Sequence, residues 1–176
     1  MNFFLDKIYK EQKKNNKILC ASEILDRVGN EIKDKSSVLY WASKNNIPVF
    51  CPALTDGAFG DLIFFQKQRN KDFQVDITED LMKIVKMSMN ADKTGVIILG
   101  GGTAKHYTLN AQIFREGAEF AVYINTGQAF EGSDSGAPVS EAKTWAKIKT
   151  NALHTKVHGD ATIIFPLVIA GVLDGK

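Results

Sequence analysis

Side chains that could do chemistry are concentrated between Asn125 and Lys149. A turn-rich loop there follows a strand-like run at 120–124, and a helix predicted through 141–149 carries further charges and a tryptophan. Separated carboxylates suit a cationic substrate better than an anionic one, because opposite charges attract. The side chains of interest in this stretch are Glu131, Asp134, Ser135, Glu141, Trp145 and Lys147.

Lys147 is the candidate nucleophile. An amine attacks only when it is unprotonated, so a lysine nucleophile needs burial or cationic neighbours, and Lys143 and Lys149 are such neighbours. The alternative is a solvated basic helix end, which the helix dipole favours. On an ideal helix Trp145 and Lys147 point about 160° apart. They can therefore line one pocket only if the helix ends by Ala146 or if two chains each contribute one of them.

A glycine turn, Gly100–Gly102, joins an apolar strand predicted at 94–99 to a helix predicted at 103–116. Glycines at such a turn let a ligand approach the backbone, and the helix N-terminus favours a phosphate. The spacing is neither G-x-G-x-x-G nor a P-loop, so a plain tight turn is an equal alternative. His106, one turn into that helix, could face the same crevice as a base, or it could be an ordinary surface or core histidine.

Carboxylates recur where predicted strands end. Asp56 and Asp61 follow a short strand predicted at 47–50, and Asp160 precedes the last predicted helix. In a parallel sheet such ends converge on one edge, where ligands bind. These acids could hold ammonium groups or ribose hydroxyls, although Asp160 has the position of a helix cap. No group of His, Cys, Asp and Glu has the spacing of a metal site, so we predict no metal.

Strand-like runs alternate with helical segments, which is typical of an α/β fold whose parallel sheet has helices on both faces. Strands are predicted at 47–50, 94–99, 120–124 and 156–157, and 62–65 fits either a strand or a helix. Helices are predicted at 2–15, 23–32, 38–44, 77–90, 103–116, 141–149 and 161–173. The expected N-caps are Ser22, Ser36, Asp76, with Glu79 completing a capping box, and Asp160.

Composition sets the broad class. The chain has 176 residues, 44% hydrophobic and 24% charged, which predicts one soluble globular domain. A net charge of +2 is too small to indicate nucleic-acid binding. Cys20 and Cys51 lack metal spacing and predict reduced thiols in an intracellular protein. The longest apolar run, 161–173, is too short to cross a bilayer, so no membrane association is expected.

Eight short segments stand out in chain order: 37–42, 47–57, 60–61, 97–102, 105–106, 123–126, 132–137 and 145–147. In this order they closely resemble the deoxyhypusine synthase family. The match runs from about Ser22 to Leu173 and covers the C-terminal half of the family's usual chain. It implies a Rossmann-like fold that lacks the N-terminal part of the family fold. We expect one domain, 1–176, with a variable helical lead-in at 1–20 and the catalytic portion at 21–176.

The resemblance implies a cytoplasmic transferase that moves the 4-aminobutyl group of spermidine, with NAD as cofactor, to one lysine of the translation initiation factor 5A precursor. Lys147 would form the enzyme imine and His106 would be the base. The implied spermidine residues are Asp61, Asp134, Glu141 and Trp145. The implied NAD residues are Asp56, Gly100, Gly101, Gly102, Thr126, Glu131, Ser135 and Asp160, of which Glu131 stands where the family usually has Asp.

Partners and alternatives follow from the same resemblance. Family members are homotetramers with active sites shared across dimer interfaces, so we expect a homo-oligomer, or a hetero-oligomer with a partner that supplies the N-terminal half. A homospermidine synthase-type polyamine transferase is one alternative function. A catalytically silent or truncated subunit that needs a partner chain is another.

Overall fold

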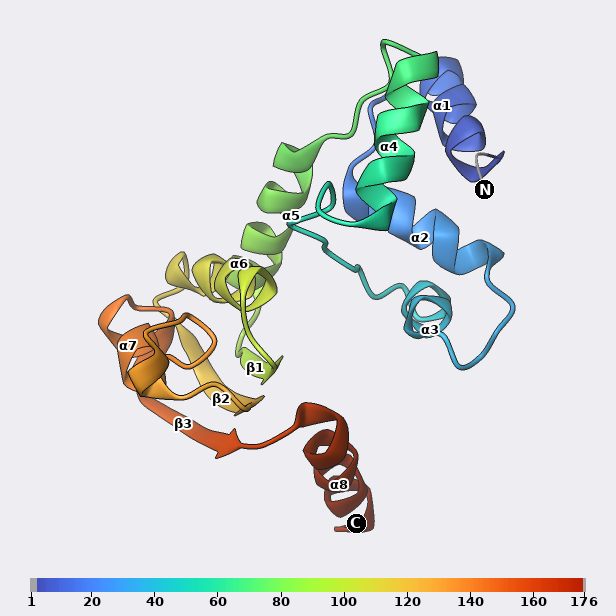
Figure 1. Ribbon diagram of the computed structural model, residues 1–176. Coiled ribbons are helices and arrows are strands. Elements are labelled where there is room, and N and C mark those ends of the chain that lie inside the picture. The colour runs from blue at the N-terminus through green and yellow to red at the C-terminus, as the bar shows by residue number, and fades with distance from the viewer. Residues whose placement is uncertain (1–2, 176) are drawn as a thin grey trace. The chain divides into compact units, whose positions relative to one another are not determined.

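The computed structural model in Figure 1 describes residues 3–175. The chain divides into two compact units, Met1–Lys83 and Ile84–Lys176, and each is described by itself. The elements are α1 (Phe3–Asn15), α2 (Ala21–Glu31), α3 (Val38–Lys44), α4 (Ala58–Arg69), α5 (Ile77–Asn90), β1 (Gly95–Leu99), α6 (Thr103–Ile113), β2 (Ala118–Asn125), η1 (Ala129–Glu131), α7 (Val139–Thr144), β3 (Ile148–His158) and α8 (Ala161–Asp174).

The N-terminal unit is helical, and its core joins α1 and α2 to the segment before α5. Leu5 and Ile8 of α1 pack with Leu19, Ile24 and Phe73, each at most 2% exposed. The helix predicted at 2–15 is present, with residue 2 outside the described residues. The apolar side of α1 predicted from its period is therefore the side that forms this core.

Two predicted N-caps are wrong by one or two positions. Cys20, not Ser22, precedes α2, and Ser37, not Ser36, precedes α3. Ser22 is buried and donates from its backbone N–H (2.8 Å) and its hydroxyl (2.6 Å) to the carboxylate of Asp80. A long-range contact to α5 thus takes the hydroxyl that was expected to cap the helix.

The strand predicted at 47–50 is absent, and 62–65 lies within helix α4. Pro48 and Pro52 have no N–H to give to a ladder. Within residues 3–83 the strand-like pairing consists of one isolated bridge, between Cys20 and Asp76. Without a partner strand, the apolar run at 47–50 cannot form a sheet and remains an extended connection.

The start of α5 was predicted correctly, but its cap is half of a capping box. Asp76 Oδ1 accepts from the N–H groups of Thr78 (2.8 Å) and Glu79 (3.0 Å). The N–H of Asp76 donates to the carbonyl of Leu19 (3.0 Å). That backbone bond replaces the expected return contact from the Glu79 side chain.

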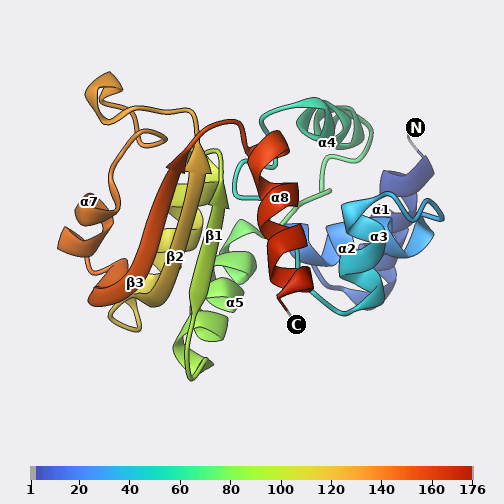
Figure 2. The same cartoon turned by 90° about the horizontal axis from the view of Figure 1, so that it is seen from below.

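The C-terminal unit is built on a parallel three-stranded sheet of order β1-β2-β3, with β2 in the centre (Figure 2). One face carries Val96 and Ile98 of β1 next to Ala121 and Tyr123 of β2. Helices α6 and α7 pack in the same hydrophobic cluster, and α8 contacts β2. The predicted α/β fold, a parallel sheet with helices around it, is confirmed.

Strand β3 is the largest departure from the predicted elements. A strand was expected only at 156–157, and 148–149 was assigned to a helix, yet β3 runs from Ile148 to His158. Ile148 is fully buried and pairs with Ala118 of β2. Pairing with a neighbouring strand, which local sequence does not report, overrides the helical preference of this segment.

The other face of the sheet is apolar and largely uncovered. Ile97 and Leu99 are 58% and 46% exposed, and Phe120 and Leu153 are also exposed. The apolar strand predicted at 94–99 is present as β1, and its burial alternates along the strand. The helix α8 was predicted correctly, with Asp160 Oδ1 accepting from Thr162 N–H (2.7 Å). Among residues 3–175, no helix has the length and apolar character needed to cross a membrane.

Candidate active site

Four of the predicted catalytic and substrate residues line one cavity in the C-terminal unit. It measures about 20 Å³, which is room for about one water molecule. Its lining residues come from α6, β2, the loop before α7, α7 itself and the turn after α7. The predicted residues on it are Asp134, Glu141, Trp145 and Lys147, and Lys105, Leu109 and Tyr123 are among its other lining residues.

The turn between α7 and β3 sets the position of Lys147. Helix α7 ends at Thr144, and Ala146 has a positive φ of 53°. The N–H of Lys147 donates to the carbonyl of Ala142 (2.9 Å), and its carbonyl accepts from Ala118 N–H (3.1 Å). Because the helix has ended, Trp145 and Lys147 both line the cavity. The first of the two geometric alternatives given by the sequence is therefore the one observed.

Lys105 is a buried cation in the cavity lining that sequence reasoning did not single out. Its side chain is 3% exposed, donates to the carbonyl of Asp134 and lies 3.9 Å from Asp134 Oδ2. Its Nζ is 5.1 Å from the centroid of the Tyr123 ring. Burial lowers the pKa of Lys105; Asp134 opposes the shift, and repulsion from Lys156 and Lys147 adds to it.

Tyr123 is a second lining residue that was missed. It is fully buried, and burial, together with the charges of Asp134 and Glu141, raises its pKa to about 12. Its hydroxyl has no hydrogen-bond partner among the described residues. In the sequence, Tyr123 is part of an apolar run at 120–124, and nothing in that run indicates that its hydroxyl faces a cavity. The hydroxyl is therefore a neutral donor available to a ligand of the cavity.

The glycine turn after β1 packs directly against the loop that carries Ser135. A Cβ added at Gly101 would lie 2.6 Å from Ser135 Cα, and Gly100 and Gly102 have positive φ angles of 76° and 83°. Gly102 precedes α6 without a side-chain cap. The N-terminus of α6 thus has no side-chain cap from Gly102, and glycine at 101 is what lets the loop come this close.

The other predicted cofactor residues follow the carboxyl ends of β2 and β3. Thr126 comes directly after β2, and its carbonyl lies 3.0 Å from Nε2 of His158 at the end of β3. Glu131 is exposed in η1, and Asp160 caps α8. Asn125, the last residue of β2, is 3% exposed, and its side-chain amide has no hydrogen-bond partner among the described residues. These features fit a ligand at the strand ends, the usual position of a dinucleotide.

Besides the glycine-turn and strand-end residues described above, three more predicted residues are absent from the cavity lining. His106 is exposed on α6, with Nδ1 3.0 Å from the side-chain nitrogen of Asn110, and it is absent from the cavity lining. Asp56 and Asp61 are exposed residues of the N-terminal unit, Asp61 in the first turn of α4. The roles assigned to these three residues, like those of the residues on the cavity and at the strand ends, remain predictions.

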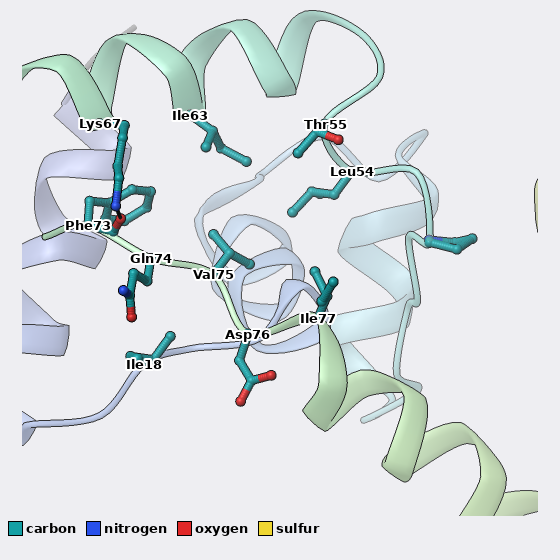
Figure 3. Close-up of a pocket in the computed structure, with 11 residues that line it drawn as sticks. Ile18, Leu54, Thr55, Ile63, Lys67, Phe73, Gln74, Val75, Asp76 and Ile77 are labelled. Atoms are coloured by element: carbon teal, nitrogen blue, oxygen red, sulfur yellow. Dashed lines mark hydrogen bonds between the residues drawn. The ribbon is translucent and has the colours of Figure 1, made fainter. Parts of the chain in front are cut away.

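A much larger cavity, about 660 Å³, lies within the N-terminal unit between α4 and the segment that leads into α5 (Figure 3). Ile63, Phe73 and Val75 are among its mostly apolar lining residues. None of the predicted catalytic, substrate or cofactor residues lines it.

Within residues 3–175, no three His, Cys, Asp or Glu side chains come together as metal ligands would.

Comparison with known proteins identifies the family. The family model described as deoxyhypusine synthase matches residues 1–172. A deoxyhypusine synthase from Candida glabrata is 54% identical over 162 residues, which are 90% of this chain and 42% of that protein. One from Senecio vernalis is 49% identical over 173 residues, 97% of this chain and 47% of that protein. The chain belongs to the deoxyhypusine synthase family.

A solved structure agrees with this assignment. A crystal structure of an Entamoeba histolytica protein, described as a candidate deoxyhypusine synthase, superposes with a TM-score of 0.68 at 31% identity. The match covers 96% of this chain and 51% of that one. The chain thus spans about half the length of the relatives it matches.

Proposed function

We propose that this chain carries the Lys147 site of an NAD-dependent transfer of the 4-aminobutyl group of spermidine to one lysine of the translation initiation factor 5A precursor. The observation that carries the proposal is the shared cavity of Lys147, Asp134, Glu141 and Trp145. A primary amine, two carboxylates and an aromatic ring are the groups that would hold a polyamine and form an imine with it.

The carboxylates and Trp145 bind and orient the substrate in this proposal. Asp134 and Glu141 attract ammonium groups of spermidine, and Asp61 of the N-terminal unit is assigned to a further one. Trp145 is 64% exposed, so its ring is open to stack on the substrate chain or its cation. Spacing between the acids would select a polyamine over a monoamine.

Lys147 forms the covalent link. When bound, NAD supplies the hydride acceptor and later the hydride donor for the butyl carbon. The Nζ of Lys147 forms a bond to that carbon, the bond to the propyl nitrogen breaks, and 1,3-diaminopropane leaves. Attack by the acceptor lysine then releases Lys147, and reduction of the new imine gives deoxyhypusine. His106 is assigned to accept the proton that the spermidine nitrogen loses.

The cofactor is assigned to the strand ends of the C-terminal unit. Gly100–Gly102 and the uncapped start of α6 would hold its phosphates. Thr126, Glu131, Ser135 and Asp160 are assigned to the rest of the group, with Asp56 from the N-terminal unit. The buried, unpaired amide of Asn125 at the same edge supports this assignment.

The small volume of the cavity favours a site that is completed by other parts of an assembly. About 20 Å³ holds about one water molecule, far less than spermidine occupies. The C-terminal unit therefore supplies part of the site, and we propose that another chain, a second copy or a partner carrying the N-terminal half, supplies the remainder in the cytoplasm. A subunit that is silent without such a partner is the second candidate function.

Borohydride trapping tests the proposal. The purified chain is incubated with NAD and spermidine, reduced, and analysed by intact mass and peptide mapping. We expect a gain of one 4-aminobutyl unit on Lys147, its absence in Lys147→Ala, and its retention in the matched Lys143→Ala variant. An adduct that persists in Lys147→Ala contradicts the assignment. An adduct that forms only when a candidate N-terminal half is added selects the partner-dependent form.

A further inference from the structure

Two lysines from different elements hold the loop that precedes α7. We define the anchored loop as 133–137, the segment that carries Asp134 and Ser135. Lys105 of α6 donates to the carbonyl of Asp134, and Lys156 of β3 donates to the carbonyl of Gly136 (2.6 Å). Because Lys156 belongs to a strand of the sheet and Lys105 to a helix packed on the sheet, these two bonds connect the loop to the rigid part of the unit.

The remaining hydrogen bonds of the anchored loop are internal in the described part of the chain. Ala137 N–H donates to the carbonyl of Ser133 (3.1 Å), and Gly136 N–H lies 3.3 Å from the Ser133 hydroxyl. Internal bonds give the loop a shape but do not fix where it lies. Its position depends on the two lysines and on its close packing against Gly101, Gly127 and Gln128.

The side chain of Lys105 is 3% exposed, which is unusual for a lysine and needs a physical reason. Lysine is almost never fully buried, because removing an ammonium group from water is expensive. Here three groups compensate for that loss: the Asp134 carbonyl, its carboxylate at 3.9 Å and the face of Tyr123. Two of the three belong to Asp134, which points to the loop as the reason for the charge.

We propose that Lys105 and Lys156 are positioning residues that fix the anchored loop, so that the Asp134 carboxylate stays on the cavity lined by Lys147. The catalytic consequence rests on the proposed function; the anchoring itself does not. Freed from the lysines, the loop would keep its internal bonds and sample other positions. Substrate binding would then weaken more than the covalent step at Lys147.

Hydrogen exchange tests the anchoring without any substrate. The variants are Lys105→Met and Lys156→Met, which keep a similar length and remove the donor. The control is Lys143→Met, because Lys143 also donates to a backbone carbonyl, that of Thr150 (2.9 Å), but not to the loop. Loss of a charged hydrogen bond should speed amide exchange in 133–137 about tenfold, with β2 unchanged and the control like the wild type.

Adduct formation tests the consequence. In both variants the spermidine concentration for half-maximal labelling of Lys147 should rise, while the rate at saturation is largely kept, and Lys156→Arg should restore the wild-type value. Unchanged loop exchange in Lys156→Met overturns the proposal, even if Lys105→Met fails to fold. The two measurements can also disagree. If the variants show faster loop exchange but the wild-type chain forms no adduct, alone or with its partner, the anchoring stands and the proposed function is overturned.

Discussion

Replacing Gly101 by alanine should separate the glycine turn from Ser135. The added Cβ would lie 2.6 Å from Ser135 Cα, about 1 Å inside the closest comfortable carbon–carbon distance. A turn of the Ser135 side chain could move its hydroxyl, but its Cα is a backbone atom, so the loop itself must move. Overpacking of this kind destabilises by about 1–3 kcal/mol. We expect Gly101→Ala to lower the free energy of unfolding by that amount and to weaken NAD binding.

Gly171→Ala is the matched control for this change. Gly171 lies within α8, and nothing is within 4 Å of a Cβ built there. The same substitution should therefore stabilise the chain by about 0.5–1 kcal/mol, because alanine is the better helix former. Urea unfolding followed by circular dichroism, at one protein concentration, measures both. Equal midpoints for the two variants would refute the close packing of Gly101 on Ser135.

Two further changes test the electrostatics of the C-terminal unit. Glu119 accepts from Arg115 (2.7 Å), Lys149 (2.7 Å) and Thr94 N–H (2.8 Å), which hold its pKa well below the ordinary 4.5. The contribution of the Glu119 carboxylate to stability is thus present above pH 4.5 and lost as the pH falls. We expect Glu119→Gln to lower the free energy of unfolding by about 2 kcal/mol at neutral pH and by less in acid. Urea unfolding at both pH values measures this difference. Tyr123→Phe removes an unpaired buried hydroxyl, so it should leave the unfolding midpoint unchanged or raise it, whereas a clear loss of stability would mean that the hydroxyl has a partner.

Elements whose signals are local were predictable from sequence. Helix α1 follows from its apolar periodicity, and α5 and α8 follow from caps at Asp76 and Asp160, which lie next to the residues they cap. The strands β1 and β2 follow from short apolar runs bounded by glycine or polar residues. These signals depend on neighbours within a few residues, so tertiary contacts do not change them.

Elements decided by distant partners were not predictable. The run at 47–50 looks like a strand but has no strand to pair with, whereas Ile148–His158 becomes one because β2 lies beside it. Ser22 failed as a cap because Asp80, far along the chain, takes its hydroxyl. Lys105 was overlooked for the same reason, since only the folded unit shows that a lysine is buried under the Asp134 loop.

The position of Lys147 shows why residue identity and site geometry need separate arguments. The sequence marks Trp145 and Lys147 as a pair, but helical geometry would send them to different sides. The fold reconciles them by ending α7 at Thr144 and placing Ala146 at a positive φ. Both backbone groups of Lys147 are then hydrogen-bonded, one to the end of α7 and one to the start of β2. A residue held between a helix end and a strand start has little backbone freedom, so the rotamers of the Lys147 side chain are its main remaining freedom.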